Sequence, residues 1–118
     1  MSDYQIARVI GPILALLLSG CTVIGPNQTA PADWPELRVQ VEKVGFWDTQ
    51  RLCGGNLLIP IAACAFVNFD HMACVIVTAT DDANVMEHEY ARCKGRDHIG
   101  STRFRDGWAR WKRTGKHQ

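Results

Sequence analysis

The chain has 118 residues, which is enough for one small domain once a leader is set aside and too few for a second domain. Its 13 lysines and arginines nearly balance its 12 aspartates and glutamates. This balance gives no indication of a nucleic-acid partner or of a strongly acidic one, so charge is informative only locally.

The first element in chain order is a hydrophobic leader. An apolar run from Val9 to Leu18 has the length of a signal-peptide core and is too short for a membrane span. The letters LSGC, which end at Cys21, follow it and resemble the lipobox of bacterial lipoproteins. This resemblance implies a signal peptide over residues 1–20, cleavage before Cys21 and lipidation of Cys21. An ordinary signal peptide and an uncleaved hydrophobic helix are the alternatives.

A lipidated Cys21 implies attachment to a membrane of the bacterial cell envelope. Two or three acyl chains such as palmitate hold a domain firmly, since each buried methylene contributes about 0.8 kcal/mol. Thr22 stands where an aspartate marks inner-membrane retention in enterobacterial lipoproteins. The expected location is therefore the outer membrane, facing the periplasm.

The next segment is expected to be a flexible tether. The letters TVIGPNQTAPADWP are rich in glycine, proline and small polar residues, which favours an extended chain over residues 21–36. Residues 37–118 then form a single small globular domain.

Three short segments of the domain are predicted to be strands. LRVQVEKV, residues 37–44, alternates apolar and polar residues as a half-buried strand does. FWDTQRLCGGN interrupts the pattern and predicts a loop or a short helical turn. CAFVNF and CVIVTAT are rich in β-forming residues, and the short DHMA between them predicts an antiparallel pair.

Two helices are predicted in the second half of the domain. Asp81 or Asp82 is placed to cap a helix over residues 83 to about 93, which Gly95 would end. An apolar stripe at helical spacing predicts a C-terminal helix, and its members are Phe104, Trp108 and Trp111. The expected fold is α+β: a small antiparallel sheet of three or four strands with a motif helix and a C-terminal helix, stabilised by disulfides.

Four cysteines remain after Cys21, and an even number in an oxidising compartment favours two disulfides. Three pairings are possible. We favour Cys53 with Cys64 and Cys74 with Cys93, because the second would clip a strand to the helix that follows it. A cysteine-ligated zinc site is the rival interpretation, although the chain has no CxxC pair.

The stretch HEYARCKGRDH, from His88 to His98, matches four of the five fixed letters of HExxHxxGxxH and resembles the signature of metzincin zinc peptidases. It is also similar to HExxHCxGxDH stretches of small bacterial lipoproteins. In that signature, two histidines one helical turn apart and a third after a glycine bind zinc, and the glutamate activates the zinc-bound water. The resemblance implies zinc as cofactor, His88 and His98 as ligands, and Glu89 as general base.

Arg92 occupies the position of the middle histidine and breaks the motif. A guanidinium stays protonated and offers no lone pair to a metal. At about 4 Å and an effective dielectric of about 20, its repulsion of a dication is roughly 8 kcal/mol. Asp97, His71 and a reduced Cys93 are the candidate substitute ligands, and Asp97 is also placed to orient His98 from outside the metal shell.

Four interpretations of the motif remain open. The site binds zinc and hydrolyses peptides; it binds zinc without catalysis; it is degenerate; or the charged residues form a solvated helix face by chance. In the degenerate case, Arg92 takes the place of the metal as a cation and pairs with Glu89 or Asp97. The function expected is a metzincin-like envelope lipoprotein of doubtful activity. The alternative is a non-enzymatic envelope or mobile-element lipoprotein that binds a protein or an anionic polymer, and no nucleic acid.

The aromatic and basic residues near the C-terminus offer a further surface. Six lysines and arginines between Ser101 and His117 surround Trp108 and Trp111, a composition that suits anionic headgroups and equally suits a solvated helix face. Trp34 and Trp47 are expected to cover the core or the tether junction in preference to binding a sugar.

Overall fold

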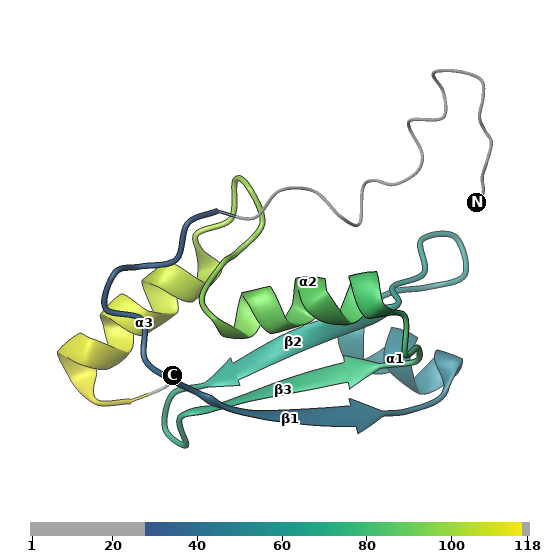
Figure 1. The fold of residues 1–118 in the computed structure, drawn as a ribbon, viewed down its shortest axis with the longest axis horizontal. Coiled ribbons are helices and arrows are strands. Elements are labelled where there is room, and N and C mark those ends of the chain that lie inside the picture. Colours follow the sequence, from purple (N-terminus) through teal and green to yellow (C-terminus); the bar gives the residue numbers. More distant parts are fainter. Residues whose placement is uncertain (1–27, 117–118) are drawn as a thin grey trace.

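The computed structural model describes residues 28–116, so Cys21 and the signal peptide expected over residues 1–20 lie outside the described residues. Three strands form one sheet, and helix α2 lies across one face of it (Figure 1). The elements in chain order are β1 (Arg38–Lys43), α1 (Phe46–Cys53), β2 (Ala63–Asn68), β3 (Ala73–Thr78), α2 (Ala83–Cys93) and α3 (Arg103–Thr114). The predicted α+β fold with three strands, a motif helix and a C-terminal helix is confirmed.

The sheet has the order β1-β3-β2 and is mixed, which corrects the expected antiparallel sheet. Strands β2 and β3 pair antiparallel as predicted, with Ala65 opposite Ile76. Strand β1 instead runs parallel to β3, with Val41 opposite Ile76. Five of the six residues of β3 are buried, whereas all six of β1 are exposed. The most apolar strand therefore takes the central position, and β1 takes an edge.

Both predicted disulfides are present. Cys53 of α1 is bonded to Cys64 of β2, and Cys74 of β3 is bonded to Cys93 of α2. The second disulfide lies in the buried core, together with Ala65 of β2 and Ile76 of β3, and it fixes α2 to the sheet.

The segment predicted to be a loop or a short helical turn is the eight-residue helix α1. It ends at Gly54, whose φ of 84° lies in the left-handed region that favours glycine. Thr49 and Gln50 are buried on the inner side of α1, while Trp47 is 64% exposed and does not cover the core.

Helix α2 begins and ends close to the predicted positions. The Asp82 side chain accepts hydrogen bonds from the N–H groups of Asn84 and Val85 and so caps the helix. After the helix, Gly95 adopts a φ of 91°. A Cβ there would lie 2.6 Å from the Trp34 ring, so only glycine fits this turn of the motif.

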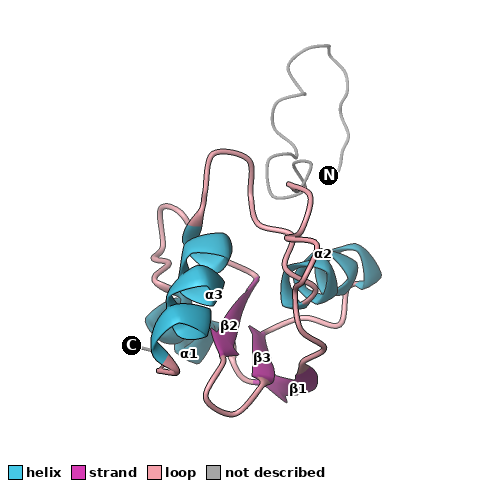
Figure 2. Ribbon diagram, turned by 90° about the vertical axis from the view of Figure 1, so that its left-hand side faces the viewer, coloured by secondary structure: helices cyan, strands magenta, loops and turns pink. Residues whose placement is uncertain are grey.

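The Trp34 ring joins the N-terminal segment to α3, as expected for a residue that covers the core. It contacts three aromatic rings, those of Phe69, Phe104 and Trp108, and its indole N–H donates to the Cys93 carbonyl at 3.0 Å. Figure 2 shows α3 on one side of the molecule and α2 on the other. No helix within residues 28–116 is long and apolar enough to span a membrane.

The predicted tether is attached to the domain from Gln28 onward. The Gln28 N–H donates to the Asp97 carbonyl at 2.7 Å, and its side-chain amide donates to the carbonyls of His98 and Ser101, at 2.6 Å each. Gln28 therefore lies against the segment that carries the end of the motif.

Candidate functional site

The motif residues line a cavity of about 380 Å³ between α2 and the start of β2. One wall is apolar and comes from residues 60–66 and Val85. The polar groups come from α2 and from the segment that follows it, and they are His88, Glu89, Arg92, His98 and Arg103. The fold thus brings four of the motif side chains to one place.

The two histidines of the motif point at each other. Their Nε2 atoms lie 3.3 Å apart, and the ring planes are nearly perpendicular, at 87°. Two nitrogen ligands at about 2.0–2.1 Å from a tetrahedral zinc are separated by about 3.3–3.4 Å, so this spacing fits two corners of a zinc site. It equally fits a hydrogen bond in which one neutral imidazole donates to the other.

Both imidazoles favour the neutral form, which has a free lone pair. Burial, the neighbouring His98 and the positive charge of Arg92 lower the pKa of His88. Burial and Arg92 lower the pKa of His98, and these effects outweigh the attraction of Asp97.

Arg92 lies in the same cavity, within ion-pair distance of two carboxyl groups. One guanidinium nitrogen is 3.9 Å from Glu89 Oε1, and another is 3.9 Å from Asp97 Oδ1. The guanidinium carbon lies 5.2 Å from the centre of the Phe104 ring, a cation–π contact. In the degenerate interpretation Arg92 pairs with Glu89 or Asp97, and both carboxyl groups lie at ion-pair distance.

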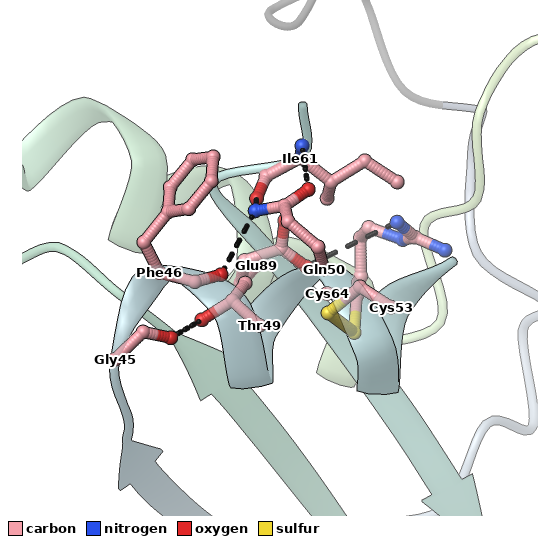
Figure 3. The surroundings of a disulfide bond; sticks show 9 residues. Gly45, Phe46, Thr49, Gln50, Cys53, Ile61, Cys64 and Glu89 are labelled. Carbon is pink, nitrogen blue, oxygen red and sulfur yellow. Dashed lines mark hydrogen bonds and ion pairs between the residues drawn. A yellow bond between two sulfur atoms is a disulfide. The ribbon is translucent and has the colours of Figure 1, made fainter. Parts of the chain in front are cut away.

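Glu89 is buried in the wall of the cavity. Only 4% of the residue is exposed, and it lines the cavity beside the Cys53–Cys64 disulfide (Figure 3). Its Oε1 atom accepts no hydrogen bond from the described residues. Burial raises the pKa of Glu89 and outweighs the attraction of Arg92. The carboxyl therefore favours its neutral form more than a solvated glutamate does.

Glu89→Gln is expected to raise the melting temperature relative to the native chain, and more at pH 8 than at pH 4. Because the folded-state pKa of Glu89 is raised from 4.5, the stability contributed by this carboxyl is present at low pH and is lost as pH rises through that pKa. Glutamine is neutral throughout and avoids the loss. Thermal unfolding followed by circular dichroism measures it, with the exposed Glu87→Gln as control. If Glu89→Gln instead lowers the melting temperature, and lowers it more at pH 8, the ion pair with Arg92 stabilises the native chain by more than burial of the charged carboxylate destabilises it.

Both oxygens of the Asp97 carboxylate accept hydrogen bonds from the segment that follows α2. One oxygen accepts from the His98 N–H at 2.8 Å, and the other accepts from the Ser101 hydroxyl at 2.9 Å and from the Phe104 N–H at 3.2 Å. Burial alone would raise the pKa of Asp97, but these hydrogen bonds outweigh it and the pKa falls. Asp97 therefore fixes the loop that presents His98.

Asp97→Asn is expected to destabilise the domain by about 2 kcal/mol at pH 7, because hydrogen bonds to a charged acceptor are the stronger ones. Because the folded-state pKa of Asp97 is lowered, the stability that this carboxylate contributes is present above about pH 4 and is lost as pH falls through that pKa. The difference in stability between the native chain and Asp97→Asn therefore becomes smaller in acid. Urea unfolding at pH 7 and pH 3.5 measures it. Asp81→Asn, which removes an exposed ion pair with Lys43, is the control and should change stability little.

The other substitute ligands are not in the site. His71 lies in the turn between β2 and β3 and does not line the cavity. Cys93 is used in its disulfide. Among residues 28–116, no three His, Cys, Asp or Glu side chains are grouped so that they could hold a metal ion. The donor set thus offers two of the three protein ligands of a catalytic zinc site.

Arg103 was not among the site residues expected from the sequence. It lines the cavity from the first turn of α3, although its position in a basic stretch gave it the appearance of a solvated residue. Only the packing of α3 beside the motif brings it there. The apolar stripe predicts which face of α3 is buried, but it does not predict which part of the domain that face packs against.

Comparison of the chain with protein-family models, with curated proteins and with solved structures finds no match.

Proposed function

We propose that this chain is a lipid-anchored protein of the bacterial envelope whose domain keeps the pocket of a metzincin-like peptidase and uses it to bind a ligand without hydrolysing it. The observation that carries the proposal is the placement of Arg92 between Glu89 and Asp97, at 3.9 Å from each. An arginine supplies positive charge and hydrogen-bond donors where the peptidase signature supplies a metal ligand. The charge is therefore a permanent part of the pocket.

Zinc-dependent peptide hydrolysis is the alternative, and the spacing of His88 and His98 favours it. Catalytic zinc sites have three protein ligands and a water. The described residues offer two ligands and place a cation beside them, which opposes a dication. We therefore derive no hydrolytic step for the native chain.

The chemistry of the cavity favours a ligand that joins an anionic group to an apolar one. Arg92 and Arg103 present guanidinium groups, which suit carboxylates because they donate two parallel hydrogen bonds. The wall formed by residues 60–66 is apolar and suits a hydrocarbon side chain. A peptide that ends in an apolar residue with a free carboxylate combines both features, and it is the partner class we propose.

The test compares an N-acetylated tripeptide that ends in leucine with the same peptide amidated at its C-terminus. Calorimetric titration of the full-length protein in detergent should show binding of the free carboxylate and much weaker binding of the amide. Arg92→Gln should abolish this preference, whereas Arg38→Gln on the exposed strand β1 should leave it intact. Equal binding of the two peptides, or an unchanged preference in Arg92→Gln, would contradict the proposal.

A further inference from the structure

The most exposed large hydrophobic residues of the described chain form the end of one loop. Between α1 and β2, Leu57 is 71% exposed, Leu58 is 91% exposed and Ile59 is 71% exposed. We call these three residues the apolar tip. Three consecutive aliphatic side chains in water are unfavourable unless something covers them.

The loop that carries the apolar tip is held in shape. The Asn56 side-chain oxygen accepts hydrogen bonds from the N–H groups of Leu58 and Ile59, at 2.8 and 2.9 Å. At the base of the loop, the Gln50 amide bonds both backbone groups of Ile61, accepting from its N–H at 2.7 Å and donating to its carbonyl at 2.8 Å (Figure 3). The tip is thus presented on a fixed base and does not collapse onto the domain.

The loop that carries the tip is uncharged and follows a helix with exposed aromatic residues. No charged residue occurs between Leu52 and Phe69. Helix α1, to which the loop is fastened by Gln50 and by the Cys53–Cys64 disulfide, adds the half-exposed Phe46 and the exposed Trp47. Aliphatic side chains at the end of a loop that follows a helix with exposed aromatic residues suit the boundary between lipid chains and headgroups.

We propose that the apolar tip inserts into the lipid bilayer to which Cys21 attaches the domain. This step rests on the lipid anchor of the proposed function. Cys21 precedes Gln28 by seven residues, so the linking chain reaches at most about 25 Å. Gln28 is bonded to the carbonyl of His98, which lines the same cavity as Pro60 and Ile61 at the base of the loop.

The attachment point and the tip therefore belong to the same side of the domain. Figure 1 shows the loop and the start of the described chain both on the side of the sheet that α2 covers. A short anchor at Gln28 brings this side toward the membrane and the tip with it. A bilayer accepts a projecting apolar loop of any shape, whereas a protein partner would need a matching groove.

The test places a tryptophan at the tip. Full-length Leu58→Trp protein is reconstituted in vesicles of phosphatidylethanolamine and phosphatidylglycerol, with and without bromine on the acyl chains. The emission of the parent protein, which has four tryptophans, is subtracted. The added emission should shift to the blue and lose most of its intensity with brominated lipid. His71→Trp, in the exposed turn at the other end of β2, is the matched control and should keep its intensity.

Unquenched, red-shifted emission from Leu58→Trp would overturn insertion, and so would equal quenching of His71→Trp. Mass spectrometry of the same preparation reports whether Cys21 carries diacylglycerol. A missing lipid would contradict the anchor, while the fluorescence separately reports on the tip, so the two failures are told apart.

Discussion

Arg92→His is expected to turn a domain that holds little zinc into one that holds close to one zinc ion per chain. His88 and position 92 are one helical turn apart on α2, and His98 Nε2 already lies 3.3 Å from His88 Nε2. The substitution supplies the third nitrogen and leaves a fourth position for water. It also removes a repulsion of roughly 8 kcal/mol between the guanidinium and a dication, at about 4 Å and an effective dielectric of about 20.

The loss of Arg92 changes the two carboxylates that face it. Asp97 keeps its three hydrogen-bond donors, so the loop that carries His98 should remain in place. Glu89 loses its positive partner, which raises its pKa further while the site is empty, because burial is then unopposed. A bound zinc ion replaces the missing charge, and this coupling should make zinc binding stabilise the variant.

The measurement is the metal content of the full-length protein after exposure to zinc and dialysis, by elemental mass spectrometry. Arg92→Gln is the matched control, because it removes the charge without supplying a metal ligand and should hold little zinc. Stoichiometric zinc in the native chain that survives Glu89→Gln would show a ligand set other than the one described. If neither the native chain nor Arg92→His holds zinc, the motif does not form a zinc-binding site even when its middle histidine is restored, and the resemblance to the metzincin signature is one of sequence letters alone.

Local features of the chain were predicted well because they depend on neighbours in sequence. Asp82 caps α2 through the N–H groups of Asn84 and Val85. The sequence left Asp81 and Asp82 open as the cap, and either aspartate before a run free of glycine and proline is sufficient to place the helix. The disulfide pairing could also be predicted, because Cys74 and Cys93 lie on elements that are consecutive in the sequence. A pairing of Arg92 with Glu89 or Asp97 was one of the four interpretations left open, and helical spacing and the position of Asp97 just after the helix account for both contacts.

The features that were missed depend on contacts between distant segments. Nothing in the alternating pattern of residues 37–44 shows whether the strand runs parallel or antiparallel to its neighbour, and the parallel pairing of β1 depends on β3 taking the centre of the sheet. Arg103 enters the cavity because aromatic packing of Phe104 and Trp108 against Trp34 fixes α3 beside the motif. The close fit of Gly95 under Trp34 likewise joins residues far apart in sequence.

Removal of the Cys74–Cys93 disulfide is expected to be the most destabilising change in the domain. The bridge closes a 19-residue span, for which the loss of loop-closure entropy in the unfolded chain is worth about 3 kcal/mol. The free energy of unfolding of a native domain is about 5–15 kcal/mol in total, so the loss of this bridge removes a large fraction of it. Cys74 is 0% exposed and Cys93 is 3% exposed, so alanine at both positions also leaves a void in the core.

The matched control is the double variant Cys53→Ala/Cys64→Ala. Its bridge spans 11 residues, and loop-closure entropy separates the two bridges by only about 0.5 kcal/mol. Cys53 and Cys64 are half-buried, so a larger gap between the variants in urea unfolding would measure the contribution of the core. We expect that gap, because Cys74–Cys93 joins β3 to the last turn of α2, one residue beyond Arg92. Equal losses would mean that both bridges act only on the unfolded chain and that the sheet and α2 hold the motif in place without covalent help.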